Sequence, residues 1–151
     1  KKSTFGYKMH IGADQDHTLI RRVDLTNASI TDTEPADDLI CGDEKAAYGD
    51  QAYHTHARHE RLAKAGIKDR LMRRPNKHHP ELPPRQKLRN QMIAKVRAAV
   101  DGLAVFKQHY GMRRLRFFNL ATNRTHCILA ACAYNLRRML GALYPPDRKP
   151  A

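Results

Sequence analysis

Long hydrophobic runs, a signal sequence and paired cysteines are all missing from this sequence of 151 residues. No window approaches the ~18 consecutive apolar residues that a membrane span requires, and the first residues lack the pattern of a secretory signal. Cys41, Cys127 and Cys132 are an odd number of cysteines without the spacing of a disulfide framework. We therefore predict a soluble, cytoplasmic protein with no membrane partner, in which Cys127 and Cys132 are small core residues of an apolar helix.

Glycine-rich phosphate loops, nucleophilic serine or cysteine signatures and internal repeats are missing as well. The histidines come nearest to a metal motif at His54, His56 and His59. On a helix, only His56 and His59 share a face, because residues three or four apart are neighbours there. We therefore favour surface or DNA-facing histidines over a metal cluster.

The length of the chain, 151 residues and 17.3 kDa, fits a single domain with a proper core. We expect this domain to span residues 1–144 and a tail to follow at 145–151. The first residue is Lys1 rather than Met, which suggests that the natural reading frame starts earlier or was trimmed. The expectation is therefore the C-terminal part of a longer protein.

Acidic residues are scarce after residue 50. Residues 1–50 hold six Lys/Arg against ten Asp/Glu, a charge of −4, whereas residues 51–151 hold 22 against five, a charge of +17. Positive charge concentrated in this way favours a polyanionic partner, so we predict nucleic-acid binding. A basic surface kept for solubility and a structural RNA binder stay open as alternatives.

The hydrophobic pattern predicts a mixed α/β layer. Strands are expected over residues 5–14, 19–26, 45–49 and 67–72, and helices over 35–40, 53–65, 85–110 and 121–140. The long basic helix has an apolar stripe at steps of three and four. Its members are Leu88, Met92, Val96, Ala99, Leu103 and Phe106.

Two isolated carboxylates, Asp50 and Asp101, are the candidates for chemistry. Asp50 follows the expected strand 45–49, where open α/β sheets place their ligands, and Asp101 lies in the basic helix. Acids can hold the metal ion of a magnesium-dependent nuclease, while the surrounding cations attract the phosphate backbone. Two structural alternatives stay open: Asp50 as a helix N-cap, and Asp101 as an intrahelical partner of Arg97 or Lys95.

A second candidate is the cationic segment after the basic helix. Arg113, Arg114 and Arg116 alternate there with aromatic residues, namely Tyr110, Phe117 and Phe118. Arginines neutralise phosphates and aromatic rings stack on unpaired bases, which predicts a contact with the DNA backbone. The alternative is that the rings belong to the core and the arginines are merely solvated.

The order and spacing of these segments resemble the DDE transposases of bacterial insertion sequences. The similarity runs through nearly the whole chain, over residues 7–14, 42–44, 48–53, 73–77, 96–101, 106–107, 110–117 and 135–138. It implies a ribonuclease-H-like mixed sheet flanked by helices, and an activity that cuts and rejoins DNA ends with Mg²⁺ (or Mn²⁺). It also implies that Asp50 is the second catalytic, metal-binding carboxylate, that Asp101, after Arg97, is the third, and that Lys107 contacts DNA.

Three departures from the family pattern accompany this resemblance. The first catalytic Asp of the family lies on a strand upstream of Gly6, and Asp14 does not replace it. The family has Glu where this chain has Asp101, whose carboxylate would fall roughly 1.5 Å short, a misplacement that can cost ~100-fold in rate. Lys107 follows Asp101 after six residues instead of seven, and on a helix of ~3.6 residues per turn six steps leave the pair about 120° apart.

These observations predict a truncated or degenerate transposase copy that binds DNA but cuts it little or not at all. Its partners would be insertion-sequence ends and target DNA near the bacterial nucleoid, with a homo-oligomer or a full-length transposase as possible protein partners. The alternative function is a catalytically inactive, basic nucleic-acid-binding remnant that acts as a transposase inhibitor.

Overall fold

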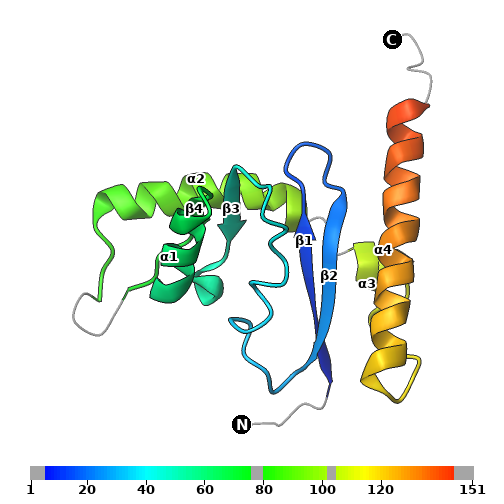
Figure 1. Cartoon of the computed structure of the whole chain (residues 1–151). Coiled ribbons are helices and arrows are strands. Elements are labelled where there is room, and N and C mark those ends of the chain that lie inside the picture. The colour runs from blue at the N-terminus through cyan, green and yellow to red at the C-terminus, as the bar shows by residue number, and fades with distance from the viewer. Residues whose placement is uncertain (1–5, 76–79, 102–104, 145–151) are drawn as a thin grey trace.

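The computed structural model describes residues 6–75, 80–101 and 105–144 (Figure 1). Two pairs of strands are flanked by helices, so the mixed α/β class predicted from the sequence is confirmed. The predicted tail at 145–151 lies outside the described residues.

Strands β1 (Tyr7–Ala13) and β2 (Ile20–Asn27) form an antiparallel hairpin. Asp14 holds the turn between them, because its carboxylate accepts the N–H groups of His17 and Leu19, both at 2.7 Å. This structural role agrees with the view that Asp14 does not replace a catalytic acid. The register slips between Gly12 and Ala13, where the backbone of β1 approaches the loop that follows β2.

Strands β3 (Ala46–Gly49) and β4 (Lys68–Leu71) run parallel, and the connection between them contains η1 (Gln51–Tyr53) and α1 (His56–Lys64). Thr55 caps α1 by accepting the N–H of Arg58, and Gly66, at φ 72°, lets the chain turn back towards β4. Leu62, Ile67 and Leu71 form a core under this unit.

Three further helices complete the fold: α2 (Pro84–Asp101), α3 (Val105–His109) and α4 (Leu120–Leu143). Helix α2 packs against β3, whereas α4 packs against β2 (Figure 1). A second core lies between β2, α3 and α4, and its buried members are Ile20, Phe106, Ala130 and Ala131.

Two asparagine side chains attach the long helices to extended backbone. Asn135 of α4 donates to the carbonyl oxygen of Ile20 and accepts its N–H, both at 2.8 Å. Asn90 of α2 donates to the carbonyl oxygen of Arg73 at 2.7 Å and accepts the N–H of Arg73 at 3.0 Å. A primary amide can imitate a strand in this way, since it offers one donor and one acceptor side by side. These contacts satisfy backbone groups at the margins of both strand pairs.

The structure corrects the helix predicted over residues 35–40, which consists of turns. In these turns, Asp37 binds the buried guanidinium of Arg58, with Nε and Oδ1 2.7 Å apart. The buried arginine organises the loop from several sides, since it also donates to the carbonyl oxygens of Thr33 and Tyr53. A tertiary ion pair thus replaces local helix formation.

Within the range 85–110 predicted as one helix, the structure describes α2 and α3, and residues 102–104 between them lie outside the described residues. The predicted apolar stripe is wrong at its start, because Leu88 and Met92 are exposed. The face that turns inward carries Arg89, Asn90 and the buried Ile93 instead. Polar contacts with β4 and its extension therefore decide the rotation of α2. At the end of the stripe, Phe106 is buried as predicted.

The prediction for the cysteines is confirmed for one of the two. Cys127 is buried in the core side of α4, and burial raises the pKa of its thiol. Cys132 is exposed on the opposite side of the same helix, so it is not a core residue. Among the described residues, no helix is both long and apolar enough to cross a membrane.

Candidate functional site

Asp50 stands at the carboxyl end of β3, where the strand gives way to η1. Its Oδ1 accepts the N–H of Gln51 at 2.6 Å, so the N-cap role considered from the sequence is confirmed. The side chain remains 45% exposed. Within the described residues, Oδ2 has no hydrogen-bond partner. Capping therefore leaves one carboxylate oxygen open to a ligand.

Arg97 of α2 reaches this carboxylate from the neighbouring helix. Its guanidinium Nη1 lies 3.8 Å from Oδ1 of Asp50 and 4.0 Å from Sδ of Met72. The contact joins the carboxyl end of β3 to the last turns of α2. Asp101 is the final residue of that helix, one turn after Arg97. Its side chain lies outside the described residues, so the pairing of Asp50 with Asp101 stays a prediction.

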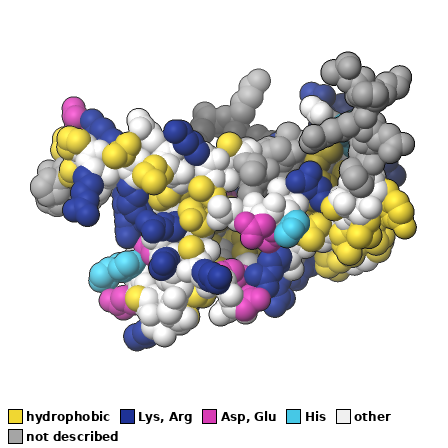
Figure 2. All heavy atoms as spheres, turned by 90° about the horizontal axis from the view of Figure 1, so that it is seen from above, with side chains coloured by type: hydrophobic (Ala, Val, Ile, Leu, Met, Phe, Trp, Pro, Cys, Tyr) yellow, Lys and Arg dark blue, Asp and Glu magenta, His cyan; other side chains and the backbone are white. Residues whose placement is uncertain are grey.

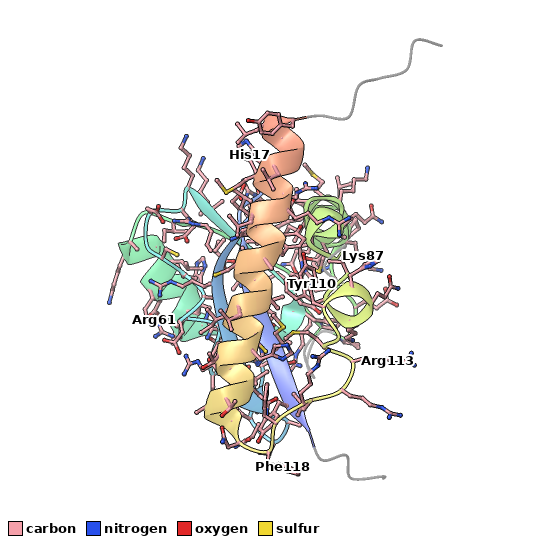
Figure 3. The ribbon with its side chains drawn as sticks, turned by 90° about the vertical axis from the view of Figure 1, so that its right-hand side faces the viewer. His17, Arg61, Lys87, Tyr110, Arg113 and Phe118 are labelled. Atoms are coloured by element: carbon pink, nitrogen blue, oxygen red, sulfur yellow. The ribbon has the colours of Figure 1, made fainter. Side chains whose placement is uncertain are left out.

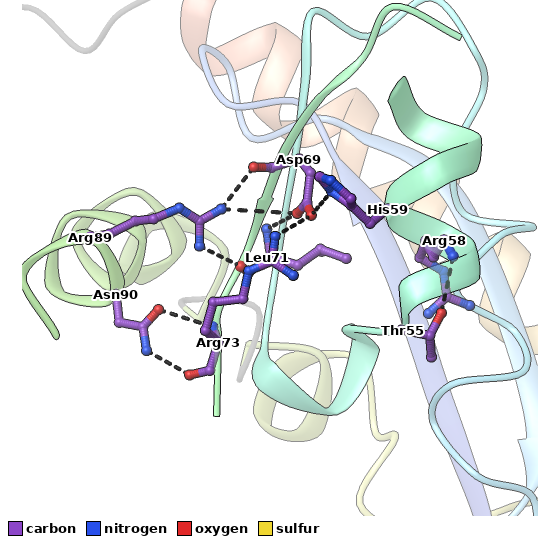
Figure 4. Close-up of polar contacts among 8 residues, drawn as sticks. All are labelled: Thr55, Arg58, His59, Asp69, Leu71, Arg73, Arg89 and Asn90. Carbon is purple, nitrogen blue, oxygen red and sulfur yellow. Dashed lines mark hydrogen bonds and ion pairs between the residues drawn. The ribbon is translucent and has the colours of Figure 1, made fainter. Parts of the chain in front are cut away.

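The position of α2 depends on a buried carboxylate in β4, Asp69, which is only 5% exposed (Figure 4). Its oxygens accept the N–H of Leu71 at 2.8 Å, Nδ1 of His59 at 2.7 Å and a guanidinium nitrogen of Arg73 at 2.9 Å. Arg89 of α2 donates to the carbonyl oxygens of Asp69 and Leu71, both at 2.8 Å. Beside it, Asn90 holds the backbone of Arg73. We call these six residues the Asp69 network.

Two opposing effects set the pKa of Asp69. Burial alone would raise it, but the hydrogen bonds from Leu71 and His59 and the charge of Arg73 outweigh burial and lower the pKa. Asp69 is therefore a structural anion at neutral pH. This network is not apparent in the sequence, because its contacts join residues from three elements. The one signal in the sequence is a lone acid inside a short, polar strand.

A second carboxylate, that of Asp32, lies near Tyr53 and the carboxyl end of β3, and the sequence did not indicate it. Burial raises the pKa of Tyr53, and the negative charges of Asp32 and Asp50 raise it further, while Arg97 opposes them. Asp32 itself pairs with Lys8 of β1, at 3.0 Å. The surroundings of Asp50 thus combine a second carboxylate and a guanidinium around a half-buried tyrosine.

The other predicted DNA-binding residues lie away from Asp50 in the chain, on α3 and the segment after it. Lys107, Arg113, Arg114 and Arg116 are all exposed. Figure 3 shows Arg113 extended away from the body of the molecule and Phe118 at its lower end. Phe118 is fully exposed and Phe117 is 44% exposed, so these two rings are not core residues. Tyr110, by contrast, stacks on Phe106 with ring centroids 5.1 Å apart.

In the described part of the chain, the histidines do not form a metal cluster with one another. His56 pairs with Glu60, and His59 belongs to the Asp69 network. Donor atoms of Cys41, Asp43 and Glu44 do lie within 4.8 Å of one another. Arg21 of β2 pairs with Asp43 at 2.7 Å and with Glu44 at 3.2 Å. These ion pairs attach the loop before β3 to β2.

The donor chemistry at Asp50 fits a divalent cation. Hard cations such as Mg²⁺ take carboxylate oxygens and keep several waters, and a half-exposed strand end provides room for both. One oxygen of Asp50 is held by a backbone N–H, which fixes the direction of the other. The nearby guanidinium shows that this position already attracts positive charge.

Comparison with known protein families identifies one family. A family model described as "Transposase DDE domain" matches residues 1–136, which is most of the chain. No curated protein and no solved structure matches the chain.

Proposed function

This chain belongs to the transposase DDE domain family, whose function is DNA transposition, and we propose from that premise that Asp50 and Asp101 are two of its metal-binding acids. The proposal deals with the catalytic centre of an insertion-sequence transposase. The observation that carries it is the 3.8 Å contact between Arg97 and Asp50, which joins the carboxyl end of β3 to α2 one turn before Asp101.

Members of this family use a divalent metal ion, and Asp50 and Asp101 would hold it here. When bound, Mg²⁺ or Mn²⁺ supplies activation of the attacking oxygen and stabilisation of the leaving oxygen of a phosphodiester. Asp50 would present Oδ2, while the N–H of Gln51 keeps Oδ1 in place. Arg97 would turn from Asp50 to a DNA phosphate. A guanidinium can bind either a carboxylate or a phosphate through two parallel N–H···O hydrogen bonds.

The Asp69 network has a positioning role in this proposal. It fixes α2 against the extension of β4 through Arg89 and Asn90, and α2 carries both Arg97 and Asp101. Errors of about 1 Å in catalytic groups can cost ~100-fold in rate, so a rigid attachment of this helix matters.

Mn²⁺ binding followed by electron paramagnetic resonance tests the metal site without any DNA. Asp50→Asn should weaken binding at least tenfold, because a neutral amide loses the charge that a hard cation requires. Asp43→Asn is the matched control, since Asp43 is an acid at the Cys41 cluster. Binding that survives Asp50→Asn and disappears in Asp43→Asn would place the ion at the loop and refute the proposal.

We propose further that the 151-residue chain binds DNA but does not cut it, because it holds two acids of the three that the family uses. A plasmid-nicking assay with Mg²⁺ or Mn²⁺, paired with a gel-shift assay, separates the two properties. The expected result is salt-sensitive binding without nicking. Robust Mg²⁺-dependent nicking that Asp50→Ala abolishes would contradict the inactivity while supporting the site.

A second candidate function is that of an inactive, DNA-binding inhibitor of a full-length transposase. The ion pair of Asp50 with Arg97 favours it, because a guanidinium in that place competes with a metal ion. Co-expression of the chain with an active transposase should then lower the transposition frequency. An unchanged frequency, despite DNA binding by the chain, would exclude this role.

A further inference from the structure

A cavity lies between α3 and the second half of α4. Its volume is about 530 Å³, which is within the range of ~300–1,000 Å³ that is usual for small-molecule sites. Its lining includes His109 and Tyr110 at the end of α3 and Tyr134, Arg137, Arg138 and Gly141 of α4. In Figure 3, Tyr110 lies beside α4. None of the described residues that line the cavity is acidic. We call it the α3–α4 pocket.

Aromatic rings form one wall of the α3–α4 pocket. Phe106 of the core stacks on Tyr110, and its ring also lies tilted against Tyr134, with centroids 5.4 Å apart. Phe106 is buried, so it holds both tyrosine rings in place, and these rings remain half-buried at the pocket. Neither tyrosine hydroxyl has a hydrogen-bond partner among the described residues. Fixed rings with available hydroxyl groups suit a planar group with polar edges, such as a nucleobase.

Two guanidinium groups of α4 provide positive charge at the pocket. Arg138 is held in place, because its Nε donates to the carbonyl oxygen of His17 at 3.0 Å and its Nη2 to Oγ1 of Thr18 at 3.3 Å. Its Nη1 donates to no described residue. Arg137 has neither a hydrogen bond nor an ion pair within the described residues, and His109 adds an imidazole. The pocket therefore offers donors to an anion and has no acid that would repel it.

The carboxyl end of α4 opposes an anion only within its last turn. The free carbonyl groups there carry a partial negative charge, and its effect falls off within one turn of the helix end. Arg137 lies six residues before Leu143, the last residue of α4, which is more than one turn. An anion is therefore expected at the two arginines and not beside the end of the helix.

We propose that the α3–α4 pocket binds a free nucleoside monophosphate, with its base against Tyr110 and Tyr134 and its phosphate on Arg137 and Arg138. A guanidinium binds phosphate through two parallel hydrogen bonds. A terminal phosphate carries a charge of about −1.5 to −2 near neutral pH, which suits two cations better than the single charge of a phosphate within a strand. The site is independent of Asp50 and of metal binding, so either proposal can fail without the other.

The size of the pocket favours a free nucleotide over a DNA strand. Proteins bind single-stranded DNA along grooves that follow roughly 4–16 nucleotides in each domain. A cavity of about 530 Å³ has room for a single nucleotide. The exposed Arg113, Arg114 and Arg116 offer a separate surface to the DNA backbone.

Isothermal titration calorimetry of the 151-residue chain with AMP tests the proposal. AMP should bind at least about tenfold more tightly than adenosine, ribose 5-phosphate or inorganic phosphate, because each of these lacks either the base or the phosphate. Arg137→Gln should weaken AMP binding about tenfold, since it removes a charged hydrogen-bond donor. Arg22→Gln is the matched control, because Arg22 is an exposed arginine of β2, and it should bind AMP like the wild type.

Gly141→Leu tests where AMP binds. A Cβ on Gly141 would meet nothing within 4 Å, so α4 can accept a side chain there, and leucine favours a helix more than glycine does. The added side chain occupies the pocket and should weaken AMP binding about tenfold, as overfilling of a fitted space does. Cys132→Leu is the control, because Cys132 is exposed on the opposite side of α4. Circular dichroism checks that both variants are folded.

Several results would overturn the proposal. Inorganic phosphate that binds as tightly as AMP would reduce the effect to a general attraction of anions. Equal losses in Arg137→Gln and Arg22→Gln, or full binding by a folded Gly141→Leu, would place AMP elsewhere. A single-stranded oligonucleotide that binds more tightly than AMP, and loses that affinity in Gly141→Leu, would assign the pocket to DNA instead.

Discussion

At the scale of single residues, the charges that are buried in this protein are structural, and the charge proposed for chemistry is half exposed. Asp69 is enclosed by donors from three elements, whereas Asp50 keeps one oxygen open at the end of β3. Buried carboxylates are stable only when their oxygens are satisfied, as those of Asp69 are. A metal ligand requires the opposite, an oxygen that is held in place and still accessible.

Replacement of Asp69 should destabilise the fold. We expect Asp69→Asn to lower the free energy of unfolding by about 2–3 kcal/mol, because it leaves the partners of a buried ion pair without their anion. Urea unfolding followed by circular dichroism measures this. Glu81→Gln, which removes the exposed pair with Lys87, is the control and should have little effect. Equal stability of both variants would show that Asp69 does not anchor α2.

The free energy of unfolding should begin to decrease as the pH falls below neutrality, because His10 is buried. This side chain is 3% exposed, and its Nε2 lies 2.9 Å from Oγ1 of Thr26. Burial lowers the pKa of His10 below 6.5, although Asp32 and Asp24 oppose the shift. The unfolded chain therefore binds a proton more readily, so stability is present above pH ~6.5 and is lost as the pH falls through the folded-state pKa. Burial lowers the pKa of His54 in the same direction.

Melting temperatures between about pH 7 and pH 5 test this expectation. We expect a decline for the wild type and a shallower decline for His10→Gln, in which the buried group no longer titrates. His56→Gln, at an exposed position, should follow the wild type. A His10→Gln slope as steep as that of the wild type would assign the decline to other groups.

At the scale of elements, close contacts between backbone segments fix the positions of strands and loops. Gly12 of β1 faces the loop after β2, and a Cβ placed on it would lie 2.8 Å from the carbonyl oxygen of Leu39. That oxygen belongs to the backbone and cannot swing aside like a flexible side chain. By contrast, a Cβ on Gly6 would meet nothing within 4 Å. Only the first of these two glycines is required by packing.

We therefore expect Gly12→Ala to destabilise the protein by about 1–3 kcal/mol, as overpacking does in tight interiors. Gly6→Ala should change stability by less than about 0.5 kcal/mol, as substitutions at open surface positions do. Thermal unfolding of the two variants and of the wild type measures these differences in stability. If both alanine variants melt together, the contact between β1 and the loop is not tight.

At the scale of the whole molecule, cationic side chains cover much of the part that holds α1 and α2, and Leu88 and Met92 of α2 are exposed among them. Figure 2 shows Lys and Arg side chains spread over the part that holds α1 and α2, and a hydrophobic region on the α4 side. The cationic surface suits a polyanion such as DNA.

The salt dependence of DNA binding should report the basic segment after α3. Each phosphate contact contributes about 0.9 to the slope of log affinity against log salt, so replacing Arg113, Arg114 and Arg116 with Gln should reduce the slope by up to about 3. Fluorescence anisotropy with a labelled duplex at several salt concentrations measures it. Arg22→Gln is the control, because Arg22 is an exposed cation within the acidic residues 1–50. An unchanged slope in the triple variant would remove this segment from the interface.

The sequence by itself determined the local elements, the segregation of charge and the family. Strands and helices follow from short-range periodicity and caps, so four strands, the helices α1 and α4 and the start of α2 were predicted within a few residues. The position of Asp50 after a strand was also predictable, because it depends on neighbours in the chain.

Only the tertiary structure decided how these elements face one another. The pairs Asn135–Ile20, Arg97–Asp50 and Arg58–Asp37 join residues far apart in the chain, and no local pattern specifies such partners. For the same reason, the sequence assigned the wrong face of α2 to the core and placed Cys132 inside it. A helix with apolar residues on two faces can bury either one, and the free energy of the polar contacts and packing around it selects between them.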